Sequence, residues 1–345
     1  MAELFFLLSG ENETLPAAEL KAILEAEGFP FEVKEQLDLV VRLDAAEDSV
    51  DAVHRRSAYT RTCVLELFVC EAEDAAIVKA AESVDFRRVL GEGESFAVRV
   101  RRVKNYSEGI GSVPLEGKLG KHILNNTAGT RVNLKKPDKT FFGVLTSGKL
   151  VFGLKLAEME ILTFSERRPR KKPYFHPSAM PSKLARCMVN LARARRGELV
   201  LDPFCGTGST MIEAGFVGCR VLGFDVQRRM AEGTRRNLTH FGVAAEGVVV
   251  ADSRRLPLMR VDRVVSDPPY GKSATTMKST TKRLVEGVLS SARGLLRIGQ
   301  LICIASPKTL GISRVGEELG YRHVESHFAY VHGTLTREIA VFEKV

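Results

Sequence analysis

The pattern of apolar and polar positions changes period along the chain, and the first 75 residues alternate between two periods. Apolar residues in every second position predict strands, and apolar residues three and four apart predict helices. The predicted elements follow the order strand, helix, strand, strand, helix, strand: 4–8, 16–27, 31–34, 39–42, 46–59 and 62–68. That order is typical of a small ferredoxin-like domain.

Residues 76–165 continue with mixed helices and strands, and residues 166–181 interrupt the pattern. The middle region predicts helices at 75–84 and 117–127 and strands at 95–102, 132–134, 140–146 and 150–156. The interruption, ERRPRKKPYFHPSAMP, holds four prolines and five basic residues. Because proline removes a backbone donor and disfavours a helix before it, we expect a linker or an extended arm. The basic residues are equally compatible with a solvated linker and with a basic segment that contacts phosphate groups.

From residue 182 onward, helices and strands alternate, which indicates a parallel sheet covered by helices on both faces. The predicted helices are 184–195, 209–217, 227–241 and 284–296, and the predicted strands are 199–201, 220–224, 247–250, 261–266 and 301–305. Two longer strands, 323–331 and 337–343, flank a Gly-Thr turn and predict an antiparallel hairpin at the sheet edge. The pattern therefore predicts an α/β protein.

Composition excludes several classes of protein. The 345 residues are 44% hydrophobic and 27% charged, which suits two or three globular domains rather than a disordered chain, a collagen-like fibre or a disulfide scaffold. No uncharged apolar run approaches the ~20 residues that span a bilayer, and MAELFFLLSGENE lacks the basic region of a signal peptide. A cytoplasmic protein is expected. The six cysteines form no C-x-x-C pair, so reduced thiols and no metal site are expected.

The net charge of +9 is unevenly distributed. Residues 1–75 hold 6 basic and 17 acidic residues, a net charge of −11. Residues 76–165 hold 15 and 9, and residues 166–345 hold 30 and 16, so the last 270 residues carry +20. Such a field attracts a polyanion such as nucleic acid, although solvated basic faces are also common.

The segment Leu201–Ser209, LDPFCGTGS, lies where a strand is expected to turn into a helix. Gly206 and Gly208 permit a sharp turn and a close approach to a ligand, which open parallel sheets hold at the carboxyl ends of their strands. No Gly-Lys-Ser/Thr follows, so this is no phosphate-binding P-loop, and the third glycine of a dinucleotide fingerprint is missing. By itself the segment also suits a plain strand–helix turn.

Acidic residues follow the next two strands. Asp225 ends VLGFD and can accept both ribose hydroxyls of an adenosine, as in NAD or S-adenosylmethionine, or can cap the following helix. Asp252, beside Ser253, follows the next strand, where a side chain can meet an adenine amino group. The spacing therefore suits an adenosine-containing ligand.

The segment Asp267–Gly271, DPPYG, follows the strand that ends in VVS. Because proline cannot donate ladder hydrogen bonds, the carbonyl groups before Pro268 and Pro269 can face a ligand. Asp267 and the Pro268 carbonyl are then acceptors, and Tyr270 offers a flat ring. An amino group on a nucleobase needs this set, because two acceptors localise its nitrogen lone pair toward a methyl donor while the ring stacks the base. A plain turn is the alternative interpretation.

DPFCGTG followed by D, DS and DPPYG resembles the Rossmann-like S-adenosylmethionine-dependent amino-methyltransferases. A C5-cytosine methyltransferase would carry a cysteine where Tyr270 stands. Three longer segments are similar to the archaeal tRNA guanosine-10 N2-(di)methyltransferases: SGENETLPAAELKAILEAEG, VNLKKPDKTFFGVL and PSKLARCMVNLARARRGELVLDPFCGTG. The resemblance covers essentially the whole chain.

This resemblance implies a domain order, a cofactor and a substrate. The implied domains are ferredoxin-like at 1–75, THUMP at 76–165, a basic proline-rich linker at 166–181 and a Rossmann-like methyltransferase at 182–345. S-adenosylmethionine is the implied cofactor, and tRNA, held near its 3′ end by the THUMP domain, is the implied substrate. The expected catalytic residues are Asp267, Pro268, Pro269 and Tyr270. The expected cofactor-binding residues are Asp202, Pro203, Cys205, Gly206, Thr207, Gly208, Asp225, Asp252 and Ser253.

The expected roles follow the order of the motifs. Gly206 and Gly208 admit the methionine part of the cofactor, and Asp202 shapes the turn and contacts the methionine amino group directly or through water. Asp225 holds the ribose and Asp252 the adenine. By the resemblance, Phe175 and Pro177 pack on the cofactor. His176 and His332 are expected at surface or packing positions, with an approach of His176 to the cofactor as the alternative.

Several alternatives stay open. One alternative is an enzyme that methylates a guanosine at another tRNA position or in rRNA. Another alternative is a non-catalytic RNA-binding module. A DNA N6-adenine methyltransferase is disfavoured, because only 58 residues separate Gly208 from Asp267 and leave no room for a target-recognition domain. A protein glutamine methyltransferase would more often carry Asn where Asp267 stands. Residues 272–283 suit both a flap over the base and a surface loop, and a small zinc-binding activator is a possible partner.

Overall fold

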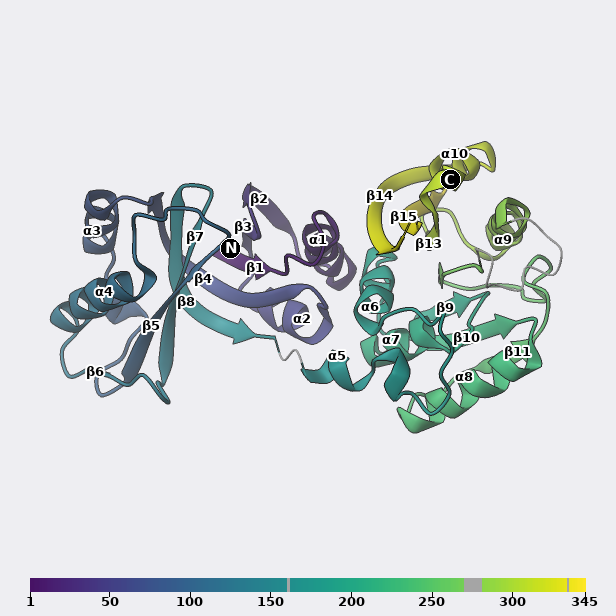
Figure 1. Ribbon diagram of the computed structural model, residues 1–345, viewed down its shortest axis with the longest axis horizontal. Helices are drawn as coiled ribbons and strands as arrows, with labels where there is room; N and C mark the ends of the chain where they lie inside the picture. Colours follow the sequence, from purple (N-terminus) through teal and green to yellow (C-terminus); the bar gives the residue numbers. More distant parts are fainter. Residues whose placement is uncertain (160–161, 270–280, 334) are drawn as a thin grey trace. The chain divides into compact units, whose positions relative to one another are not determined.

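The computed structural model describes residues 1–159, 162–269, 281–333 and 335–345, and the chain forms two compact units (Figure 1). The first unit comprises Met1–Glu11, Phe29–His54 and Thr60–Met159. The second comprises Asn12–Gly28, Arg55–Tyr59 and Glu160–Val345. Each unit has its own sheet and its own hydrophobic core.

The first unit is built on an eight-stranded sheet with the order β2-β3-β1-β4-β8-β7-β5-β6. Its strands are β1 (Ala2–Leu8), β2 (Phe31–Leu37), β3 (Val40–Ala45), β4 (Thr60–Glu71), β5 (Ser95–Arg102), β6 (Arg131–Val132), β7 (Lys139–Thr146) and β8 (Lys149–Glu158). The half formed by β2, β3, β1 and β4 is antiparallel throughout. This is the strand order of a ferredoxin-like fold, as the sequence predicts.

The expected boundary at residue 75 does not separate two sheets. β4 pairs with β8 from Thr62 to Glu71, so the regions before and after the boundary share one sheet. Gly153 of β8 permits this pairing, because a Cβ atom there would lie 1.9 Å from the Leu65 carbonyl oxygen. The unit also contains α3 (Asp74–Glu82), α4 (Ser112–Asn126) and most of α2 (Ser49–Arg56). The assignment of residues 76–165 to a THUMP domain stays a prediction.

Helix α1 (Leu15–Glu27), which the sequence places in the ferredoxin-like domain, belongs to the second unit. Its Leu15 side chain joins the core that surrounds helix α6 (Ser182–Leu191). The buried Glu19 carboxylate accepts a hydrogen bond at 2.9 Å from the side-chain amide of Asn190 on α6. A helix pattern reveals which side chains are apolar but not which of two domains they contact.

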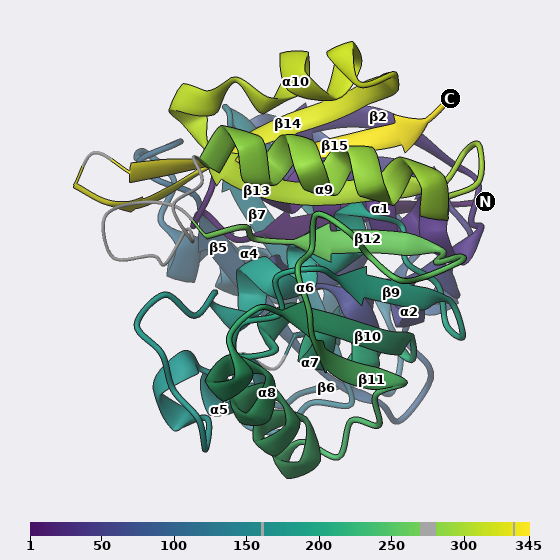
Figure 2. The same cartoon turned by 90° about the vertical axis from the view of Figure 1, so that its right-hand side faces the viewer.

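The second unit is built on a seven-stranded sheet with the order β11-β10-β9-β12-β13-β15-β14 (Figure 2). Its strands are β9 (Leu199–Asp202), β10 (Arg220–Asp225), β11 (Gly247–Val250), β12 (Arg263–Ser266), β13 (Leu301–Pro307), β14 (Tyr321–His332) and β15 (Leu335–Lys344). The strands from β11 to β13 are parallel, whereas β15 and β14 are antiparallel. The predicted parallel sheet with a terminal antiparallel hairpin is confirmed.

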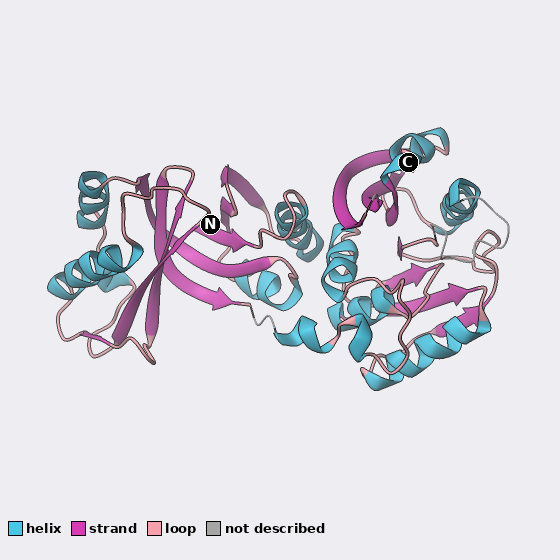
Figure 3. Ribbon diagram, in the orientation of Figure 1, coloured by secondary structure: helices cyan, strands magenta, loops and turns pink. Residues whose placement is uncertain are grey.

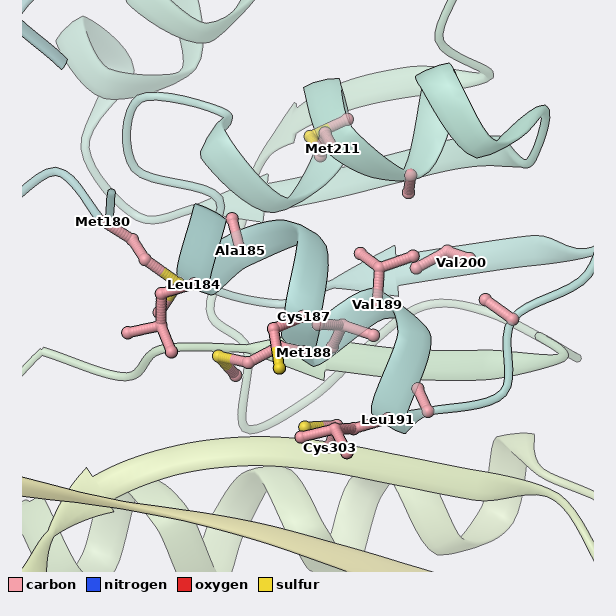
Figure 4. Close-up of a cluster of buried hydrophobic side chains, with 14 of the residues drawn as sticks. Met180, Leu184, Ala185, Cys187, Met188, Val189, Leu191, Val200, Met211 and Cys303 are labelled. Carbon is pink, nitrogen blue, oxygen red and sulfur yellow. The ribbon is translucent and has the colours of Figure 1, made fainter. Parts of the chain in front are cut away.

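Successive residues of the central strands enter two different cores, because strand side chains alternate between the faces of a sheet. Val200 and Val221 lie in one core, and their neighbours Leu201 and Leu222 lie in the other. Figure 3 shows the helices that flank this sheet, and Figure 4 shows part of the first core around α6. The first core receives side chains from α6, α7 (Ser209–Val217) and α8 (Arg228–His240), and the second from α9 (Thr281–Leu295) and α10 (Ile312–Glu318).

The proline-rich segment folds as an arm on the second unit. It follows a short helix, α5 (Leu162–Glu166). Asn237 of α8 clamps the arm: its Oδ1 accepts the backbone N–H of Tyr174 at 2.8 Å, and its Nδ2 donates to the Tyr174 carbonyl at 2.9 Å. The segment includes a short 3-10 helix, Pro169–Lys171, so it is not extended throughout. In the part of the chain that the structure describes, no helix is long and apolar enough to cross a membrane.

Candidate active site

A cavity of about 200 Å³ lies at the carboxyl ends of the parallel strands of the second unit. Residues that follow β9, β10, β11 and β12 line it, together with residues of the proline-rich arm, α8, α9 and β15. Parallel strands bring their carboxyl ends to one edge of a sheet, which is why motifs far apart in sequence meet there.

Asp202, the last residue of β9, connects two of the motifs. Its Oδ1 accepts hydrogen bonds from Ser266 Oγ at 2.6 Å and from the Phe204 backbone N–H at 3.1 Å, and its Oδ2 accepts one from Thr210 Oγ1. Ser266 is the last residue of β12, so the Asp202 carboxylate links the glycine turn by hydrogen bonds to the segment that carries Asp267. Burial of the carboxylate, which is 3% exposed, raises the pKa of Asp202 to about 6.

The glycine turn between β9 and α7 requires its two glycines. Gly206 has φ +53° and Gly208 has φ +78°, the left-handed region that other residues rarely adopt. A Cβ atom at Gly208 would also lie 3.0 Å from the Thr234 side chain. The turn brings Ser209 and Thr210, at the start of α7, to the cavity wall.

Asp225, the last residue of β10, faces the same turn. Its Oδ2 accepts the backbone N–H of Gly206 at 3.1 Å, and its Oδ1 accepts that of Gln227 at 2.8 Å. Gln227, not Asp225, stands at the N-cap of α8, so the helix-cap alternative does not apply. Burial is the main cause that raises the pKa of Asp225. A carboxylate has about four acceptor positions, so two more donors can be accommodated.

Asp252 and Ser253 complete the wall beyond β11. The Asp252 carboxylate accepts hydrogen bonds from the Arg254 backbone N–H at 3.0 Å and from its Nε at 3.0 Å. The hydrogen bond to the Arg254 guanidinium is the main cause that lowers the pKa of Asp252. This acceptor is ionised across the neutral pH range.

The segment after β12 contributes Asp267, Pro268 and Pro269 to the cavity lining. Asp267 Oδ2 accepts a hydrogen bond at 2.9 Å from Nη2 of Arg337, which also lines the cavity. Tyr270, the fourth expected catalytic residue, lies outside the described residues.

The structure brings most of the expected site residues to one cavity, although their roles stay predictions. Those that line it are Asp202, Cys205, Gly206, Thr207, Asp225, Asp252, Ser253, Asp267, Pro268 and Pro269. Pro203 and Gly208 do not line it, although Gly208 adopts the positive φ of the adjoining turn. His176 lines the cavity and contacts Ser178 Oγ at 2.7 Å, whereas Phe175, Pro177 and His332 do not line it.

Sequence reasoning missed several wall residues. Met180 and Ala179 of the arm, Met230 of α8, Leu284 of α9 and Arg337 of β15 line the cavity. None of them belongs to a motif. A signal existed only for the arm, whose prolines indicated an extended segment able to lie across a domain.

An open parallel sheet, a glycine turn after its first strand and carboxylates after the next strands define a Rossmann-like, S-adenosylmethionine-dependent methyltransferase. In agreement, residues 169–337 match the family model described as RMKL-like, methyltransferase domain. A DNA methylase model matches residues 87–236. That second match includes the glycine turn but ends before Asp267.

Two curated relatives are similar over nearly the full length. The chain is 39% identical to the tRNA (guanine(10)-N2)-dimethyltransferase of Methanothermobacter thermautotrophicus, covering 99% of this chain and 100% of that protein. It is 31% identical to the enzyme of the same name from Methanocaldococcus jannaschii, covering 99% of both chains. The chain belongs to this family of tRNA guanine-N2 methyltransferases.

Solved structures show the same fold across the whole chain. TrmN from Thermus thermophilus has 22% identity and a TM-score of 0.55, with 99% of this chain and 100% of that chain covered. The methyltransferase SMU.472, solved with SAH, has 14% identity and a TM-score of 0.55, with 100% and 99% covered. At these identities the likeness concerns the fold alone.

Proposed function

We propose that this protein methylates the exocyclic N2 of a guanosine in tRNA, at position 10, in one or two successive transfers. The similarity to two tRNA (guanine(10)-N2)-dimethyltransferases over the full length supports this proposal most strongly. The acceptors at Asp267 and Pro268, both at the cavity, give it a chemical basis.

The residues after β9, β10 and β11 suit the cofactor. The Asp225 carboxylate retains acceptor capacity for the two ribose hydroxyls beside its backbone hydrogen bonds. In this proposal Asp252 accepts from the adenine amino group, and the buried Asp202 carboxylate accepts from the methionine ammonium; both residues line the cavity. The turn at Gly206 allows a close approach of the backbone. When bound, S-adenosylmethionine supplies an electrophilic methyl group.

The residues after β12 suit the target base. The lone pair of guanine N2 is delocalised into the ring, so the amino group is a poor nucleophile. The Asp267 carboxylate and the Pro268 carbonyl would accept its two N–H bonds, localise the lone pair and direct it along the cavity. The guanosine must first leave its stack, which costs a few kcal/mol. Positioning of this kind contributes about 7–11 kcal/mol to a transfer reaction.

The predicted THUMP domain, residues 76–165, would hold the tRNA. Its net charge of +6 suits a polyanion. In the VNLKKPDK segment, Asn133 Oδ1 accepts the backbone N–H groups of Lys135 and Lys136, both at 3.2 Å. This local turn leaves the two lysine side chains exposed, where phosphates can reach them.

A small zinc-binding activator and a cytoplasmic location complete the proposal. β11 is an edge strand, and its Val249 and Val250 are 39% and 46% exposed, an apolar edge that a partner would cover. Raised solubility of the chain on co-expression with such a protein would support the partner. The six cysteines are free thiols, which suits a reducing compartment.

The test is methyl transfer from labelled S-adenosylmethionine to an unmodified tRNA transcript, followed by nucleoside analysis. N2-methyl- or N2,N2-dimethylguanosine is expected, and it should disappear in an otherwise identical transcript with position 10 changed from G to A. If methylguanosine still forms in the changed transcript, the target is a guanosine at another position. If only rRNA is methylated, the target lies in another RNA. N6-methyladenine in a DNA duplex would overturn the proposal. Cofactor binding without any transfer, even with added cell extract, would favour the RNA-binding module.

A further inference from the structure

The terminal hairpin contributes an arginine, Arg337, to the cavity wall, where it pairs with the expected catalytic carboxylate. β15 runs antiparallel to β13, with Arg337 opposite Pro307, and β13 pairs with β12, which ends at Ser266. An antiparallel strand begins where its parallel neighbours end. Arg337, near the start of β15, therefore lies at the carboxyl ends of β12 and β13.

The pair that Arg337 forms with Asp267 is largely shielded from water. The side chains are 10% and 16% exposed, and Nη2 lies 2.9 Å from Oδ2. Both residues also line the cavity. A guanidinium hydrogen bond to one carboxylate oxygen restricts rotation about the Cβ–Cγ bond, so it sets the direction of both oxygens.

A purely structural role explains this placement poorly. Buried ion pairs contribute little net stability, because the cost of removing both charges from water offsets their attraction. The remainder of the hairpin is held by apolar residues of β15 such as Ile339 and Phe342, which are fully buried. A charged pair at the end of the hairpin, on the cavity wall, points instead to a role in the site.

We propose that Arg337 is a positioning residue, which holds the Asp267 carboxylate in the orientation that accepts the N–H of the target amino group. This inference rests on the proposed N2 methylation. A carboxylate that rotates freely would accept hydrogen bonds from water, and the reacting nitrogen would lose its alignment. Misplacement by about 1 Å can cost about 100-fold in rate.

The test compares R337M, which removes the charge at similar length, with R337K, which keeps the charge but not the planar fork. R337M should lower kcat about 100-fold, with KM for tRNA and Kd for S-adenosylmethionine within about twofold of wild type, and R337K should fall between R337M and wild type. The matched control is R322M, which removes the ion pair of Arg322 with Glu343 from the same hairpin and should leave kcat unchanged.

Three results would overturn the inference: a kcat for R337M within twofold of wild type, an equal loss in R322M, or a loss confined to KM or Kd. If R337M unfolds, R337K and R337Q, assayed well below their melting temperatures, replace it and are held to the same criteria. Failure of the proposed function is distinguishable, because wild-type protein would then produce no methylguanosine. A wild-type enzyme that is active beside a fully active R337M would refute the role of Arg337 alone.

Discussion

Protonation of Asp202 is expected to weaken cofactor binding below pH 6. Burial raises the pKa of this carboxyl to about 6, against the opposing effect of donors such as Ser266 Oγ and Thr210 Oγ1. Above that pH the group is ionised and can pair with the methionine ammonium of S-adenosylmethionine. Below it, the neutral carboxyl loses this ion pair.

The contribution of Asp202 to the free energy of unfolding follows from the displacement of its pKa from 3.8 to about 6. At about 1.36 kcal/mol for each pKa unit, this displacement of the pKa corresponds to a free energy of about 3 kcal/mol. Because the pKa in the folded protein lies above that in the unfolded chain, the associated stability is complete below pH 3.8 and is lost as the pH rises through 6. The pH dependence of cofactor binding has the opposite sign: binding strengthens as the pH rises, because the bound ammonium group favours the ionised carboxylate. The Kd should be constant above about pH 7 and rise about tenfold per pH unit below 6.

Calorimetric titration with S-adenosylmethionine between pH 5 and pH 8 measures this effect, with circular dichroism at each pH to verify that the protein is folded. D202N should bind more weakly at pH 8, and its Kd should change less between pH 8 and pH 5 than the Kd of the wild-type protein, because the introduced amide does not titrate. A wild-type Kd that is the same at pH 5 and pH 7 would refute the reasoning. An unchanged slope in D202N would assign the titration to another group.

Three further predictions concern single substitutions. Asp267→Ala should abolish turnover and spare cofactor binding, as measured by nucleoside analysis and calorimetry; near-normal turnover would exclude the role assigned to this residue. Gly233→Ala should lower stability by about 1–3 kcal/mol, because its Cβ atom would lie 2.0 Å from the Tyr174 ring, whereas Gly294→Ala on α9, with nothing within 4 Å, should raise it by about 0.5–1 kcal/mol. Equal melting temperatures for these two variants would contradict this packing argument. Glu213→Gln should lower the free energy of unfolding by about 3–5 kcal/mol, because it removes the carboxylate that pairs with the buried Arg186 and the half-buried Arg167; denaturant unfolding within 1 kcal/mol of wild type would refute this.

Local pattern was enough to predict most elements. The helix at 209–217 and the strands at 95–102 and 247–250 have the predicted bounds, and the terminal hairpin lies at the predicted edge. Short apolar runs bounded by turn residues, and apolar residues that alternate with basic ones, are easy to recognise. The short helices α5 and α10 were missed, since seven residues or fewer span too few turns to show a period.

Local pattern could not decide which element packs on which unit. Helix α1 stands second in a ferredoxin-like order, yet it belongs to the second unit, where Glu19 bonds to Asn190. The sheet likewise runs through β4 and β8, across the expected boundary at residue 75. Both are long-range pairings, which leave no signal in the spacing of neighbouring residues.

The sequence by itself determined the class of chemistry, because the glycine turn and the DPPYG segment each need particular residues at consecutive positions, and consecutive positions can be read directly. Only the tertiary structure decided what stands opposite those motifs. The Ser266–Asp202 hydrogen bond joins residues 64 positions apart, and the Arg337–Asp267 pair joins residues 70 positions apart. Their proximity depends on the order and direction of strands in the sheet. Backbone pairing across the whole unit sets that order, not the residues of either motif.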